Sequence, residues 1–125
     1  MGILSGLLGN ATEIDVQKVE KEFELILAPQ EQIEKAFQLI RDLLVFTDKR
    51  LVMVDKQGVT GKKVEYRSIP YKSVTNFAVE TAGHLDLDAE LKIWVSGIHE
   101  PIVKEFKKDK NIFDVQKTLA RFVLK

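Results

Sequence analysis

Apolar residues near the N-terminus recur every three or four positions, which is the spacing of one helix face. Thr12 and Asp15 stand three residues apart at the start of this pattern, as in a variant of the capping box, and predict that a helix begins there. Pro29 ends the pattern, because proline cannot continue a helix. The predicted buried face comprises Val16, Val19, Phe23, Ile26 and Leu27.

From Gln32 onward the pattern changes to short β-rich runs. Two of these runs flank a polar link and predict a hairpin with Asp48 and Lys49 at its tip. Further runs at 64–69 and 74–81 are separated by a step that contains Pro70 and Tyr71. The chain from Gln32 to this second run is therefore expected to form several sequential strands.

Residues 85–95 carry the clearest strand pattern. Their alternation predicts a half-buried strand with one solvated face, and its inward residues are Leu85, Leu87, Ala89, Leu91, Ile93 and Val95. Pro101 suits the edge or the first position of the last strand, because it has no N–H to donate. Asn111 then caps a final amphipathic helix, whose apolar stripe is Ile112, Val115, Leu119, Phe122 and Val123.

This succession predicts a mainly β fold of the β+α type. About seven short strands joined by tight links and closed by one helix describe a small antiparallel barrel or sandwich. We divide the chain into an N-terminal helical extension at 1–30 and a β domain at 31–125.

Composition narrows the functional classes. The 125 residues are 45% hydrophobic, and 19 basic and 19 acidic residues cancel to a net charge of zero. This balance argues against intrinsic disorder and against a generic polyanion binder. Cysteine is absent, which excludes disulfides and thiolate metal sites. The longest uncharged stretch, 1–12, is shorter than the roughly 20 residues of a membrane span and lacks a basic signal region, so we expect a cytoplasmic protein.

The ordered pattern resembles the bacterial pleckstrin-homology (PH) domain family. The resemblance lies in residues 43–54, with Thr-Asp-Lys-Arg-Leu at their centre, in the step Ile69, Pro70, Tyr71, and in the aliphatic strand that follows. It implies a seven-stranded, bent antiparallel barrel capped by the C-terminal helix, without catalytic residues. It also implies a binding or assembly module, since some members of the family form closed homo-oligomeric rings. Eukaryotic relatives bind phosphoinositides through a basic loop, but the corresponding residues 39–42 are short and neutral, so we do not expect that function.

Candidate chemical motifs do not point to an enzyme. The glycines of segment 58–63 are too close together for a phosphate loop, and the segment predicts a hairpin turn. Ser96, His99 and Glu100 are merely close in sequence, which is no evidence for a triad. One face of the predicted strand carries His84, Asp86, Asp88 and Glu90. Neighbouring side chains on a strand face lie about 7 Å apart, so these four cannot alone surround a cation. We therefore expect no catalytic residue, no cofactor and no metal ion.

Charge segregation is more informative. Residues 13–35 hold seven acids and three bases, residues 48–72 hold seven bases and three acids, and residues 80–90 hold four acids without Lys or Arg. Such segments either neutralise each other within one molecule or form complementary faces between identical subunits, as in a head-to-tail ring. Trp94 on the polar side of its strand either packs under a neighbouring element or contacts another subunit.

We therefore expect a self-associating module, a homo-oligomer whose partner is itself or another protein. The candidate interaction surface comprises Ile3, Leu4, Leu7, Leu8, Lys49, Arg50, Lys62, Lys63, Asp86, Asp88, Glu90 and Trp94. The alternative is a peripheral membrane adaptor that uses the apolar N-terminal stripe and the basic hairpin region. Nucleic acid is not an expected partner, because the basic face of the last helix has no interleaved aromatic residues.

Overall fold

The computed structural model describes residues 12–13, 15–39, 42–57, 63–81, 89–106 and 111–125. In chain order, the described elements are β1 (Thr12–Glu13), α2 (Val16–Glu22), β2 (Ile33–Gln38), β3 (Leu43–Thr47), β4 (Arg50–Gln57), β5 (Lys63–Pro70), the 3-10 helix η2 (Tyr71–Ser73), β6 (Val74–Thr81), β7 (Ala89–Val95), β8 (Ile102–Phe106) and α3 (Asn111–Val123).

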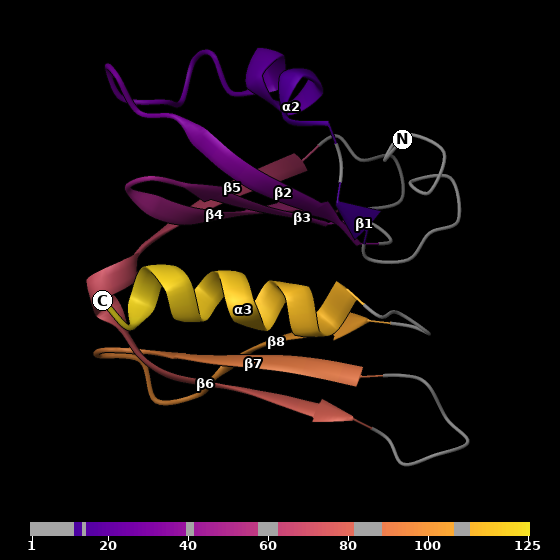
Figure 1. The fold of residues 1–125 in the computed structure, drawn as a ribbon, viewed down its shortest axis with the longest axis vertical. Helices are drawn as coiled ribbons and strands as arrows, with labels where there is room; N and C mark the ends of the chain where they lie inside the picture. Colours follow the sequence, from indigo (N-terminus) through magenta and orange to yellow (C-terminus); the bar gives the residue numbers. More distant parts are fainter. Residues whose placement is uncertain (1–11, 14, 40–41, 58–62, 82–88, 107–110) are drawn as a thin grey trace.

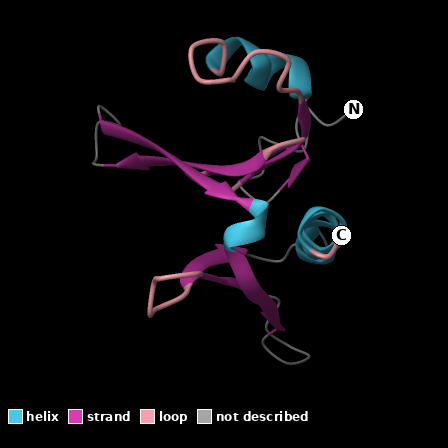
Figure 2. Cartoon of the chain, turned by 90° about the vertical axis from the view of Figure 1, so that its left-hand side faces the viewer, coloured by secondary structure: helices cyan, strands magenta, loops and turns pink. Residues whose placement is uncertain are grey.

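The strands form two antiparallel sheets. One has the order β1-β2-β3-β4-β5 and the other has the order β6-β7-β8. Figure 1 shows α2 above the larger sheet and α3 between the two sheets, and Figure 2 shows α3 end-on beside them. The mainly β class with a C-terminal helix is confirmed, but the described strands do not close into one barrel. The chain leaves β5 through η2 and starts a separate sheet, and the apolar stripe of α3 packs against both sheets.

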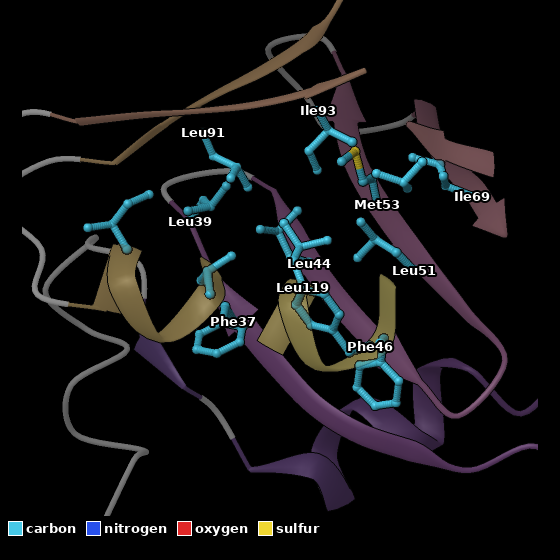
Figure 3. Packing of buried hydrophobic residues seen from close by; sticks show 14 of the residues in the cluster. Phe37, Leu39, Leu44, Phe46, Leu51, Met53, Ile69, Leu91, Ile93 and Leu119 are labelled. Carbon is cyan, nitrogen blue, oxygen red and sulfur yellow. The ribbon is translucent and has the colours of Figure 1, made fainter. Parts of the chain in front are cut away.

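The main core lies between the two sheets and α3. Phe37, Phe46 and Leu119 are fully buried there, together with Leu91 and Ile93 from β7 (Figure 3). The predicted inward positions of residues 89–93 are thus confirmed, while Leu85 and Leu87 lie outside the described residues. The predicted stripe of the last helix is also confirmed: Ile112, Val115, Leu119 and Phe122 are buried and Val123 is partly buried.

A second core lies on the opposite face of the larger sheet, under α2. It joins Val19 and Phe23 to Leu43, Val45 and Val52, with Ile26 and Leu27 partly buried against it. Because both faces of the sheet are covered, all five residues of β3 are buried.

The bounds of α2 differ from the expected ones. Thr12 pairs with Gln38 in the sheet, and Asp15 is the N-cap, since its carboxylate accepts a hydrogen bond from the backbone N–H of Gln17 at 2.9 Å. The helix ends at Glu22, so Phe23, Ile26 and Leu27 of the predicted helix face lie beyond its end, although they still pack in the second core. The division into 1–30 and 31–125 stays a prediction.

Candidate interaction surfaces

The predicted hairpin of β3 and β4 is confirmed, with Asp48 and Lys49 at its tip. Asp48 does not extend freely from this tip. Its carboxylate accepts a hydrogen bond from the backbone N–H of Gln32 at 2.8 Å, and its own N–H donates to the carbonyl of Gln32 at 2.9 Å. The tip is therefore held against the segment that leads into β2.

A buried ion pair fixes the same region. Arg50 Nε donates to Glu31 Oε2 at 2.9 Å and Nη2 donates to Oε1 at 2.9 Å, which is a bidentate arrangement. The side chain of Glu31 is only 1% exposed, against 21% for Arg50. Thr47 Oγ1 also donates to Glu31 Oε2, at 2.6 Å, and the backbone N–H of Ala28 donates to Oε1. Burial by itself would raise the pKa of Glu31, but the hydrogen bonds from Arg50, Thr47 and Ala28 outweigh it and lower the pKa to about 2.

The other hydrogen bonds of Arg50 are also made within the molecule. Its Nη2 donates to the carbonyl of Ile26 at 2.9 Å, and its Nη1 donates to Ser68 Oγ at 2.7 Å. The guanidinium thus connects the segment after α2, the hairpin tip and β5. We therefore remove Arg50 from the proposed interaction surface. The role of Glu31 was missed because it lies 19 residues from Arg50; the only signal in the sequence was an acidic segment and a basic one that could neutralise each other.

Tyr71 links the hairpin to the C-terminal helix. Its hydroxyl donates to the carbonyl of Thr47 at 2.6 Å, and its ring stacks on Phe122 with a centroid distance of 4.8 Å. Burial raises the pKa of Tyr71 far above its usual value, and the nearby carboxylates of Glu34, Asp48 and Glu31 raise it further. The Pro-Tyr step that carries part of the family resemblance is thus a structural element of the core.

The outward face of the smaller sheet carries a row of acids. Glu90 of β7 lies directly opposite Glu80 of β6 on one side and Glu105 of β8 on the other. Lys92 compensates one of them, because its Nζ lies 2.8 Å from Glu80 Oε1. This hydrogen bond lowers the pKa of Glu80 and raises that of Lys92. We call Glu80, Glu90 and Glu105 the acidic row.

Apolar side chains lie on the same outward face. Trp94 stands on β7 opposite Asn76 and is half-buried. Val103 stands on β8 opposite Lys92 and is 44% exposed. Neither lies in either of the two cores. Trp94 is therefore on the solvated side of its strand, as predicted from the alternation.

The other residues of the candidate surface fall into two groups. Lys49 and Lys63 are exposed, as is Lys56 near the end of β4. The others lie outside the described residues: Ile3, Leu4, Leu7, Leu8, Lys62, Asp86 and Asp88.

The structure brings together no alternative chemical site within the part of the chain that it describes. Ser96, His99 and Glu100 are exposed in the turn between β7 and β8, where Gly97 adopts a φ of 85°. His84 lies outside the described residues. The described residues contain no group of three or more His, Cys, Asp or Glu side chains placed to hold a metal ion. None of the described helices is long and apolar enough to cross a membrane.

Comparison with known proteins gives a consistent result. The family model for the bacterial PH domain matches residues 2–123. The uncharacterized protein YjqA of Bacillus subtilis strain 168 is 60% identical over 121 residues, which cover 96% of this chain and 97% of that protein. A pleckstrin homology domain from Shewanella amazonensis SB2B has 54% identity and a TM-score of 0.85, with coverage of 99% of this chain and 100% of that one. A DUF1696 family protein with a pleckstrin-homology domain from Shewanella loihica PV-4 has 52% identity and a TM-score of 0.81, with coverage of 92% and 98%.

Proposed function

The chain belongs to the bacterial PH domain family, and from this premise we propose that it is a non-enzymatic binding and assembly module that associates with further copies of itself. The observation that carries the proposal is the outward face of the smaller sheet. There the acidic row, Trp94 and exposed Val103 lie together on three adjacent strands. Tryptophan is enriched at protein interfaces, and like charges directly opposite each other in a sheet cost stability unless a partner compensates them.

The compensating charges are available on the larger sheet. Lys49, Lys56 and Lys63 are exposed along the β3–β4 and β4–β5 hairpins. Arg50, in contrast, is neutralised within the molecule by Glu31. We propose that the end of the β4–β5 hairpin that carries Lys56 and Lys63 contacts the acidic row and Trp94 of the next copy; Lys49 lies at the other end of β4 and stays outside this contact. Such a contact joins two different surfaces and is therefore head-to-tail, which yields a ring when the rotation between copies closes.

The experiment is light scattering coupled to size exclusion. At micromolar concentration and moderate salt, the mass is expected to be a multiple of 14.2 kDa, and it should fall in high salt because the contact is partly ionic. Trp94→Ala should lower the mass. Phe113→Ala is the matched control, since Phe113 is an aromatic residue that is 54% exposed on α3, away from this face.

Circular dichroism must show that both variants are folded. A wild-type chain that remains monomeric throughout the concentration series would overturn the proposal. Equal masses for the wild type and Trp94→Ala would show that association uses another surface.

A further inference from the structure

The outer edge of β5 is the most regular strand edge in the described part of the molecule. β5 ends the five-stranded sheet, and no described strand pairs with its outer side. All eight of its residues pair with β4 from Arg50↔Pro70 to Gln57↔Lys63 without a register shift. Figure 2 shows the β4–β5 hairpin extending to the side of the molecule opposite α3, while the ring of Tyr66 in β5 packs against Phe23 at the end of α2. Such an edge presents N–H and C=O groups in a regular row, which is a template for another strand.

The other described edges are less suited to pairing. β1, at the opposite end of the larger sheet, has only two residues. β6 contains a register shift between Val74 and Asn76, and α3 packs beside it. β8 has five residues and begins directly after Pro101. Short strands, irregular pairing, proline and charged side chains are features by which proteins block edge pairing. Before its last residue β5 has only the charges, Lys63, Glu65 and Arg67, and their alternating signs can be matched by a strand of the right register.

The side chains of β5 alternate between two faces. Val64 and Tyr66 lie on the face that carries α2, where they are 37% and 39% exposed. Lys63, Glu65 and Arg67 lie on the opposite face, so bases flank a central acid. Exposed apolar groups on one face and alternating charges on the other specify how a second strand can align.

We propose that β5 pairs antiparallel with β5 of a second copy about a two-fold axis through the Tyr66 pair. In this register Tyr66 stands opposite Tyr66 of the other copy, and Glu65 stands opposite Arg67 on both sides of the axis. Val64 faces Ser68, and Lys63 faces Ile69. The pairing joins two five-stranded sheets into one continuous sheet. The inference deepens the proposed self-association but uses a different, two-fold symmetric contact.

Charge decides between this register and its neighbours. In such a pairing the two-fold axis is perpendicular to the sheet and passes between two copies of the same residue. Each possible register is therefore defined by the residue of β5 at which the axis lies. An axis at Glu65 places the two Glu65 side chains opposite each other and sets Lys63 against Arg67. An axis at Arg67 places two guanidiniums together. An axis at Val64 leaves only residues 63–65 of β5 paired. The axis at Tyr66 is the one that matches opposite charges over most of the strand.

The first test is a charge swap on the full-length chain. Glu65→Arg and Arg67→Glu each place like charges opposite each other twice, and each should raise the dissociation constant by about tenfold or more. The double variant Glu65→Arg/Arg67→Glu restores opposite charges and should recover the wild-type constant. A mixture of the two single variants should also recover it, as a heterodimer. Lys117→Glu is the matched control, because Lys117 is an exposed lysine on α3, outside both proposed contacts, and its charge reversal should have little effect.

The second test uses the absence of cysteine from the chain. Residues directly opposite in an antiparallel pair have Cα atoms about 4.5–5.5 Å apart, which suits a disulfide. Tyr66→Cys should therefore form a covalent dimer on mild oxidation. Val64→Cys is the control on the same exposed face, since its two copies would lie about 13 Å apart along the strands. Circular dichroism checks that each variant is folded.

The outcomes separate this inference from the proposed function. Recovery in the swap together with cross-linking at Tyr66 supports the β5 pairing. The β5 pairing is overturned if the wild type self-associates, all charge variants have the same mass as the wild type, and Tyr66→Cys does not cross-link. The head-to-tail contact is unaffected by that result. Cross-linking at Val64 in place of Tyr66 overturns the assigned register. A wild type that is monomeric at all concentrations overturns both proposals.

Discussion

Glu31→Gln tests the energetic role of the buried ion pair. The change keeps the size of the side chain but removes the charge that Arg50 contacts through two hydrogen bonds. The folded chain holds the pKa of Glu31 at about 2, against an ordinary value of 4.5. By linkage this difference corresponds to about 3 kcal/mol of stability at neutral pH. Removing one partner of a buried pair costs about 3–5 kcal/mol, which agrees in magnitude.

The dependence on pH follows from the direction of the shift. The pKa is lower in the folded chain than in the unfolded chain, so the stabilisation is complete above pH 4.5 and is lost as the pH falls towards 2. Urea unfolding of wild type and Glu31→Gln should therefore differ by about 3 kcal/mol at pH 7 and by about 1 kcal/mol at pH 2.5. A difference below about 1 kcal/mol at pH 7 would refute the reasoning. So would a difference that is the same at both pH values.

Glu34→Gln is the matched control for this prediction. Glu34 is also a glutamate near the start of β2, but its carboxylate lies 3.7 Å from the exposed guanidinium of Arg121. Their side chains are 34% and 63% exposed, so solvent screens the pair. We expect a loss below about 0.5 kcal/mol at pH 7.

Two further substitutions test the main core. Tyr71→Phe keeps the ring against Phe122 but leaves the carbonyl of Thr47 without its 2.6 Å donor, which should cost about 1–3 kcal/mol in urea unfolding; an unchanged midpoint would show that water replaces the hydroxyl. Leu119→Ala removes a fully buried side chain between the sheets and should cost about 2–5 kcal/mol, whereas exposed Phe113→Ala should cost less than about 0.5 kcal/mol. Equal losses at these two helix positions would contradict the packing described for α3.

Local patterns predicted most of the elements. The sequence pattern predicted the hairpin at Asp48 and Lys49, the alternation along β7 and the apolar stripe of α3, because each depends on residues close in sequence. It did not predict the start of α2. Both Thr12 and Asp15 can cap a helix, and the local pattern does not separate them. The helix begins after Asp15 because Thr12 is a strand residue that pairs with Gln38.

The candidate surface was predicted only in part. Trp94 and Glu90 could be placed on the solvated face from alternation alone, but Glu105 joins them only through the pairing of β7 with β8. Arg50 shows the opposite case. Its place in a basic segment predicted contact with a partner, but two hydrogen bonds to buried Glu31 neutralise it within the molecule.

The sequence by itself thus determined the order of the strands, the two amphipathic helices and the nearly continuous apolar run of β3. Only the tertiary structure decided that both faces of β3 are covered, with Phe46 towards α3 and Val45 towards α2. Only the tertiary structure decided that the described strands form two sheets and that β5 is the last strand of the larger one. The physical reason is range. Periodicity reflects neighbours within a few residues, whereas ion pairing, sheet order and free edges depend on which distant segments meet.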